Sequence, residues 1–195
     1  MDKQIFIING SGGVGKDKFI EMISDQSYTP VAINDSCTID IKRCEIGNYS
    51  SVSKVKKIAK IIGWNGTKTE RDRKFLSDLK LLTSEYNNMP LNDMKEFANK
   101  FMNGSKFNIA RILFLHIREP EEIAKAIDEF KEYNVKTILV KRNHVEHIIS
   151  NMADENVYNY TYDIIINNDG TKEDLREKAG QFLDDCLNDA LKSEY

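Results

Sequence analysis

A glycine-rich segment between an expected strand and an expected helix constrains this chain more than any other feature. It follows the apolar run 5–8, has the spacing GxxxxGK that ends at Lys16, and precedes an apolar helical pattern. Glycines let successive backbone N–H groups face one anion, and the lysine can reach the β and γ phosphate oxygens of a nucleotide. The pattern therefore predicts a phosphate-binding loop for a nucleotide, made of Gly10, Ser11, Gly12, Gly13, Val14, Gly15, Lys16 and Asp17.

The residue after the loop lysine departs from the common pattern. Asp17 stands where a serine or threonine usually gives its hydroxyl to Mg²⁺. A carboxylate is a hard oxygen ligand that can hold the same ion directly or through water. The sequence thus predicts that Asp17 is the metal-binding residue and Mg²⁺ the metal.

Length and charge narrow the classes of protein to consider. A chain of 195 residues with 41% hydrophobic residues can form one substantial core, so we expect a single domain over residues 1–195. The formal net charge of −3 argues against a dedicated nucleic-acid binder. No apolar run is long enough to span a bilayer, and no secretory leader pattern is present, so we expect no membrane partner and a cytoplasmic location.

The three cysteines suggest neither a disulfide framework nor a zinc site. Cys37, Cys44 and Cys186 are odd in number and form no CxxC pair. We expect them to be reduced and mostly buried.

Short apolar runs alternate with helical patterns along the chain. Runs rich in Ile, Val, Leu and Phe are typical of strands buried on both faces of a parallel sheet. We therefore expect an α/β, three-layer P-loop NTPase fold with a five-stranded parallel sheet flanked by helices. The expected strands are Gln4–Asn9, Pro30–Ile33, Ile109–Ile117, Lys136–Lys141 and Tyr162–Ile166.

Helix-start signals support this arrangement. A proline with acidic neighbours at Pro120 indicates a first helical turn, and Thr171 with Asp174 has the form of a capping box. The stretch of about 36–108 is longer than one crossover requires. We expect it to be a helical, acceptor-binding insertion between the second and third strands, with one of its helices opened by Thr69 and Asp72.

Basic residues concentrate between positions 54 and 80. They can bind an anionic acceptor near the loop, or they can simply form solvated helix surface. Lys68, Arg71 and Arg73 are the best candidates for acceptor binding, because they follow a Gly–Trp–Asn–Gly turn and flank a helix start. Trp64 in that turn can stack on a ring or anchor a hinge. The basic residues are Lys54, Lys56, Lys57, Lys60, Lys68, Arg71, Arg73, Lys74 and Lys80.

Further polar residues follow the ends of expected strands. Arg118 and Arg142 should emerge at the carboxyl edge of the sheet, where open α/β folds bind ligands. Arg118 can instead pair with Glu119 or Glu122. Asp35 can position Mg²⁺ or a substrate hydroxyl, or form part of a capping turn. His116 stands where such folds often carry a strand-end acid, and a lone histidine is more often a hydrogen-bonded core residue than a catalyst. His144 and His147 lack the pattern of a metal pair.

Taken together, the GKD form of the loop, Trp64 to Arg73, Arg118 and the Asn–Asp–Gly turn at 168–170 resemble P-loop small-molecule kinases of the nucleoside monophosphate kinase fold. The chain looks most similar to phage-type deoxynucleoside monophosphate kinases and the related phosphomevalonate kinases. The resemblance implies that Arg118 contacts phosphate, that Arg71 or Arg73 contacts the acceptor, and that Asn168 lies near the base of ATP. Two positions depart from that family: His116 replaces an acid, and Lys18 replaces a threonine or aromatic residue.

The resulting prediction is an ATP- and Mg²⁺-dependent kinase that acts on a small phosphorylated substrate. The favoured substrate is a (deoxy)nucleoside monophosphate. Lys16, Arg118 and Arg142 are the predicted catalytic residues, and Asp35, Lys68, Arg71 and Arg73 the predicted substrate-binding residues. The alternatives are a kinase of a non-nucleotide phosphate ester such as phosphomevalonate, or a nucleotide-binding regulatory module without phosphoryl transfer. The chain is expected to be a monomer or a homodimer.

Overall fold

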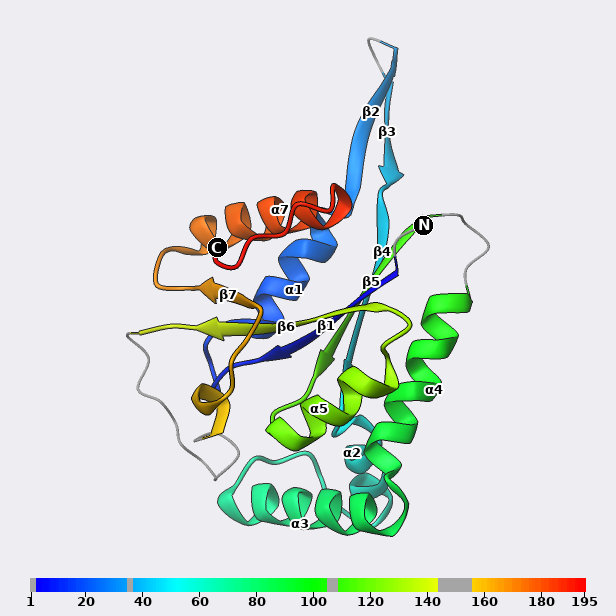
Figure 1. Ribbon diagram of the computed structural model, residues 1–195, viewed down its shortest axis with the longest axis vertical. Coiled ribbons are helices and arrows are strands. Elements are labelled where there is room, and N and C mark those ends of the chain that lie inside the picture. Colours follow the sequence, from blue (N-terminus) through cyan, green and yellow to red (C-terminus); the bar gives the residue numbers. More distant parts are fainter. Residues whose placement is uncertain (1–2, 35–36, 105–108, 144–155) are drawn as a thin grey trace.

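A five-stranded, entirely parallel sheet forms the centre of the computed structural model, which describes residues 3–34, 37–104, 109–143 and 156–195 (Figure 1). The strand order is β4-β5-β1-β6-β7, and the first strand of the chain pairs with β5 on one side and β6 on the other. The carboxyl end of β1 is therefore central at its edge of the sheet. The strands are β1 (Lys3–Asn9), β4 (Cys44–Ser50), β5 (Ala110–His116), β6 (Asn134–Lys141) and β7 (Ile164–Asn167).

Helices cover both faces of this sheet (Figure 1). Alternate residues of β1 point to opposite faces, so Phe6 packs in the buried cluster that includes α1 and α7, whereas Ile5 packs in the cluster that includes α4 and α5. The expected α/β fold with a five-stranded parallel sheet flanked by helices is confirmed. The helices are α1 (Lys16–Asp25), α2 (Ser53–Ile61), α3 (Glu70–Asn87), α4 (Met89–Asn103), α5 (Pro120–Glu129), the 3₁₀ helix η1 (Asn156–Asn159) and α7 (Lys172–Leu187).

Both expected capping boxes are present. Thr69 accepts a hydrogen bond from the backbone of Asp72 and caps α3, while Thr171 and Asp174 do the same for α7. Helix α5 begins at Pro120, as the sequence indicated. Local start signals therefore located these three helices correctly.

The expected second strand was wrong. Residues Pro30–Ile33 lie in β2 (Tyr28–Asn34), which pairs antiparallel with β3 (Cys37–Lys42) in a separate two-stranded sheet. The second strand of the main sheet is β4, which occupies its edge and contains Glu45, Gly47 and Asn48. An edge strand has only one neighbour and is partly exposed, so β4 lacks the continuous apolar run by which the other strands were found.

The helical insertion is accordingly shorter than the predicted 36–108. Residues 37–50 form strands β3 and β4, apart from Arg43 between them, and the helices between β4 and β5 are α2, α3 and α4. These helices do lie between the second and third strands of the parallel sheet. Asp35, His144 and His147 fall outside the described residues.

Two further expectations concern the cysteines and the membrane. Cys44 and Cys186 are buried free thiols, as expected. Within the described ranges, no helix combines the length and apolar character that a bilayer span requires.

Candidate functional site

The glycine loop, residues 10–16, connects the carboxyl end of β1 to the first turn of α1. Gly10, Gly13 and Gly15 have φ angles of 143°, 81° and 100°, in a region that other residues rarely adopt. A Cβ atom on Gly15 would collide with the side-chain amide of Asn168, and one on Gly10 would collide with the carbonyl oxygen of Val140. Backbone conformation and lack of space therefore both require glycine at these two positions.

The Lys16 side chain folds back over this loop. Its Nζ donates hydrogen bonds to the carbonyl oxygens of Gly10 and Ser11, the latter at 2.7 Å. The ammonium group is thereby held against the inner backbone of the loop, at the amino end of α1. A helix amino terminus carries partial positive charge, so two positive features coincide here and together favour an anion.

Asn168 holds the glycine loop in place through hydrogen bonds. Its side chain is buried, and Nδ2 donates to the carbonyl oxygen of Val14 at 2.8 Å. Its backbone N–H donates to the carbonyl oxygen of Lys141 at 2.8 Å. These bonds give Asn168 a positioning role, which the sequence did not indicate because the two bonded residues are 154 positions apart. The contact with the base of ATP remains a prediction.

Three residues that sequence reasoning missed surround the loop. Asn9 ends β1; its Nδ2 donates to the carbonyl oxygen of Arg118 at 3.1 Å and to the hydroxyl of Tyr162 at 2.8 Å. Asn9 Oδ1 accepts from the backbone N–H of Gly10 at 2.8 Å. The hydroxyl of Tyr158 lies 2.9 Å from Ser11 Oγ. Because Asn9 directly precedes the glycine loop, the sequence could have identified it as a residue of the site. Nothing in the sequence distinguishes Tyr158 or Tyr162 in this way.

Asp17, in the first turn of α1, and His116, at the end of β5, lie close together beside the glycine loop. We call their neighbourhood the mouth of the loop. His116 Nε2 is 2.8 Å from Asn48 Oδ1 and 3.8 Å from Asp17 Oδ1. Burial lowers the pKa of His116 to about 4, the Asp17 carboxylate opposes this, and Lys16 and other nearby cations add to the lowering. The imidazole is therefore neutral at pH 7 and forms a hydrogen bond with Asn48. The side chain of Asp17 is 91% exposed and its carboxylate is accessible to a ligand.

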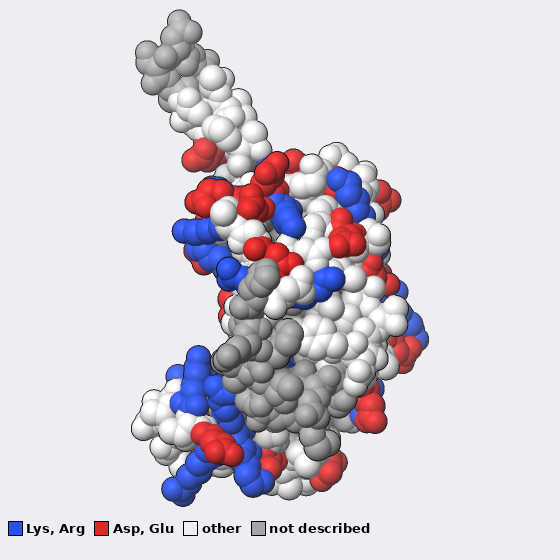
Figure 2. Space-filling view, turned by 90° about the vertical axis from the view of Figure 1, so that its left-hand side faces the viewer, with Lys and Arg blue, Asp and Glu red and all other residues white. Residues whose placement is uncertain are grey.

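Cations from three segments lie near this mouth: α2, the stretch before α3 and the stretch after β5. Partial burial lowers the pKa of Lys56 on α2, and the positive charges of Lys68 and Arg118 lower it further, while Asp17 acts in the opposite direction. Lys68, Arg118 and Asp17 are thus each within electrostatic reach of Lys56. We refer to Lys56, Lys68 and Arg118 as the mouth cations. Figure 2 shows Lys and Arg side chains gathered at the lower end of the molecule, where α2 and α3 lie in Figure 1.

Arg71 and Arg73, the other predicted acceptor residues of the inserted region, are exposed, as Lys56 and Lys68 are. Arg71 and Arg73 occupy the first turn of α3, and Arg73 Nε donates to the carbonyl oxygen of Lys68 at 3.3 Å. Trp64 is half-buried, and its indole N–H donates to the carbonyl oxygen of Thr67 at 3.0 Å. This bond favours the anchoring interpretation of Trp64. Arg142 is half-buried and follows β6 at the same edge of the sheet as the glycine loop.

Lys80 does not belong to the exposed basic surface. It is buried, and its Nζ lies 2.7 Å from both Glu119 Oε2 and Glu122 Oε2. The two glutamates considered as partners of Arg118 thus bind Lys80 and join α3 to the start of α5. Burial and the neighbouring carboxylate raise the pKa of Glu122 to about 7; burial also acts to raise the pKa of Glu119, but the Lys80 ammonium holds it below its ordinary value.

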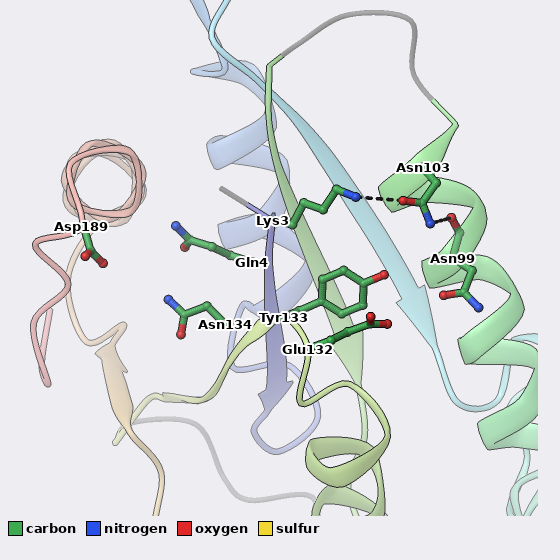
Figure 3. A pocket seen from close by; sticks show the side chains of 8 residues that line it. All are labelled: Lys3, Gln4, Asn99, Asn103, Glu132, Tyr133, Asn134 and Asp189. Atoms are coloured by element: carbon green, nitrogen blue, oxygen red, sulfur yellow. Dashed lines mark hydrogen bonds between the residues drawn. The ribbon is translucent and has the colours of Figure 1, made fainter. Parts of the chain in front are cut away.

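A hollow of about 580 Å³ lies at the opposite edge of the sheet (Figure 3). Lys3 and Gln4 open β1 and line it, whereas the glycine loop follows the other end of the same strand. The hollow is therefore separate from the loop. In the described part of the chain, no three His, Cys, Asp or Glu side chains form a group that could hold a metal by themselves. The remaining lining residues are Asn99, Asn103, Glu132, Tyr133, Asn134 and Asp189.

No protein-family model matches the chain, and no curated protein matches it in sequence. Among solved structures, the tunicamycin resistance protein of Deinococcus radiodurans is similar with a TM-score of 0.46 and 9% sequence identity, over 92% of this chain and 94% of that one. The functional assignment therefore rests on the chain's own residues.

Proposed function

We propose that this protein is an ATP- and Mg²⁺-dependent P-loop kinase that transfers a γ-phosphoryl group to a small phosphorylated acceptor. The acceptor that we propose is a (deoxy)nucleoside monophosphate. The glycine loop carries the proposal. Three of its glycines have positive φ angles, and the Lys16 ammonium lies against its backbone at the end of the central strand. This combination of backbone, cation and helix amino terminus suits a polyphosphate.

On the nucleotide side, the loop N–H groups and Lys16 would hold the β and γ phosphates. Asp17 would hold Mg²⁺, which in such sites is bound by one or two carboxylates together with phosphate oxygens and water. The exposed carboxylate of Asp17 fits this requirement. When bound, Mg²⁺ would offset negative charge on the transferred group.

On the acceptor side, the mouth cations Lys56, Lys68 and Arg118 would bind the acceptor phosphate. Two anionic substrates repel each other, so cations between them lower the cost of bringing them together. Arg71 and Arg73 remain predicted acceptor contacts, and Arg142 a predicted contact to the transferred group. His116 would contribute no positive charge, because its imidazole is neutral at pH 7.

An ADP-release assay tests the proposal. The natural chain is given ATP, Mg²⁺ and each ribo- and deoxyribonucleoside monophosphate in turn, with phosphomevalonate as the non-nucleotide acceptor. We expect at least one nucleoside monophosphate to accelerate ADP release, and Lys16→Ala to reduce that rate about 100-fold or more. The exposed Lys57→Ala is the matched control and should leave the rate unchanged.

Other outcomes would refute the proposal in distinct ways. Acceleration by phosphomevalonate alone would contradict the nucleotide acceptor but not the kinase. Stoichiometric ATP binding without acceptor-dependent ADP release would contradict phosphoryl transfer and favour a regulatory nucleotide-binding module.

A further inference from the structure

Asn9 is a buried polar residue at the point where β1 ends and the glycine loop begins. It is 1% exposed, and its side chain makes hydrogen bonds to Gly10, Arg118 and Tyr162. These partners belong to three segments, namely the glycine loop, the stretch after β5 and the stretch before β7. A buried amide whose donors and acceptor are all paired holds its neighbours in one arrangement.

The partners themselves fix which way the amide of Asn9 points. The backbone N–H of Gly10 requires the side-chain oxygen, whereas the carbonyl oxygen of Arg118 requires the side-chain nitrogen. Tyr162 donates its hydroxyl hydrogen to the carbonyl oxygen of Val157 at 2.9 Å, so it accepts the second N–H of Asn9. Burial raises the pKa of Tyr162 well above its ordinary value, so the phenol keeps this hydrogen. Turning the amide over would place two donors together at Gly10 and two acceptors together at Arg118.

Asn9 continues the connection between β1 and β5 beyond the end of their backbone pairing. The last pair in the register of these strands is Ile8 with His116. Arg118 lies two residues after His116, and the Asn9 side chain reaches its carbonyl oxygen at 3.1 Å. One side-chain amide therefore bonds both the first residue of the glycine loop and the backbone of a mouth cation.

A second contact joins the stretch before β7 to the loop. The hydroxyl of Tyr158 lies 2.9 Å from Ser11 Oγ, and the carbonyl oxygen of Ser11 accepts from Lys16 Nζ at 2.7 Å. Among these bonds, the one from Asn9 to Arg118 extends to the acceptor side. This makes Asn9, rather than Tyr158, the residue to test.

We propose that Asn9 is a positioning residue that holds the nucleotide site and the acceptor site at a fixed separation. This inference rests on the proposed function, in which the glycine loop binds the phosphates of ATP and Arg118 binds the acceptor phosphate. The separation of the loop from Arg118 then decides whether the two phosphates meet in a reactive geometry. Asn9 would act through Gly10 and through the Arg118 backbone, without touching either substrate.

A double-mutant cycle between Asn9 and Arg118 tests this role, with the nucleoside monophosphate that gives the fastest ADP release as acceptor. At saturating ATP, Asn9→Ala should raise the KM for the acceptor about tenfold, because the Arg118 side chain is displaced. In an Arg118→Ala background no guanidinium remains to be displaced, so adding Asn9→Ala should change that KM by less than about twofold. An unchanged KM in Asn9→Ala, or the same factor in both backgrounds, would overturn the inference.

Gln4→Ala is the matched control for the loss of a buried amide. Gln4 lies at the opposite end of β1, is 5% exposed, and donates from Nε2 to the carbonyl oxygen of Cys186 at 3.0 Å. Its removal should lower the stability to urea and leave the KM for the acceptor unchanged. Asn9→Leu, which has the shape of asparagine without its polar atoms, is the second variant should Asn9→Ala fail to fold.

A binding measurement separates this inference from the proposed function. In the Arg118→Ala chain, titration with ADP should shift the backbone amide NMR signal of Glu119, because binding at the loop alters the hydrogen bonds of Asn9 and hence the carbonyl that precedes Glu119. The shift should disappear when Asn9→Ala is added, and a shift that persists would overturn the inference. ADP binding needs no phosphoryl transfer, so this test stands even if no acceptor accelerates ADP release and the kinase proposal fails. A natural chain that does not bind ADP would overturn both.

Discussion

Replacing Lys80 by Met should destabilise the protein by leaving two carboxylates without their cation. Lys80 is 10% exposed at its side chain, and its Nζ lies 2.7 Å from Glu119 and from Glu122. Methionine keeps much of the apolar length of lysine but removes the charge. The variant therefore isolates the electrostatic contribution of the ammonium group.

The expected loss follows from the burial of the three groups. Removing one partner of a buried ion pair typically costs about 3–5 kcal/mol. The side chains of Glu119 and Glu122 are 38% and 26% exposed, and solvent screens them in part, so we expect the lower end, about 3 kcal/mol. For a chain of this length that corresponds to a melting temperature lower by about 6–12 °C.

The loss should increase with pH. In the natural chain, the raised pKa of Glu122, about 7, stabilises the folded state at acid pH, and this contribution disappears as the pH rises through that value. The lowered pKa of Glu119 contributes in the opposite direction and is lost as the pH falls through its folded value. Without Lys80 both carboxyl pKa values rise, so Lys80→Met should be mildest near pH 5 and most harmful near pH 8.

Urea unfolding at about pH 5 and about pH 8 measures both effects. Lys74→Met is the matched control on the same helix, because Lys74 is 76% exposed and its pair with Asp78 is a surface pair, worth less than about 1 kcal/mol. An equal loss at both pH values, or a loss no greater than that of Lys74→Met, would refute the reasoning and attribute the effect to packing.

Three further predictions concern the candidate site. Gly15→Ala should abolish ATP binding measured by calorimetry, because alanine is strained at a φ of 100° and its methyl group would collide with the Asn168 amide. Normal affinity would contradict the loop geometry. His116 should remain neutral in an NMR titration down to about pH 4, and since its folded pKa lies below the ordinary value, stability should fall as the pH drops through the interval between them; an imidazole titrating near neutrality would contradict its burial. Lys56→Gln should raise the KM for the acceptor about tenfold or more, while Lys57→Gln should not; equal effects would remove Lys56 from the proposed acceptor site.

Local features of the sequence predicted much of the secondary structure. The capping residues Thr69 and Thr171 located two helix starts, and continuous apolar runs located four of the five parallel strands. The strand at the sheet edge escaped detection because Gly47 and Asn48 interrupt its apolar character. Apolar periodicity reports burial, and a partly exposed strand carries too little of it.

The candidate site was predicted most directly where its residues adjoin in the chain. The spacing of the glycine loop identified Lys16 and Asp17, because a loop between a strand and a helix is a local structure. Lys56 was one of nine basic residues in its region, and nothing in the sequence distinguished it from Lys57. Its proximity to Arg118 depends on where the fold places α2 relative to the residues that follow β5.

The sequence by itself thus determined the phosphate-loop pattern and three helix starts. Tertiary structure alone decided that Asn168 supports the loop and that Lys80 is buried between two glutamates. The physical reason is the range of the interactions. Capping, turns and periodicity act over a few residues, whereas strand order and the burial of a charge depend on contacts between segments far apart in the chain.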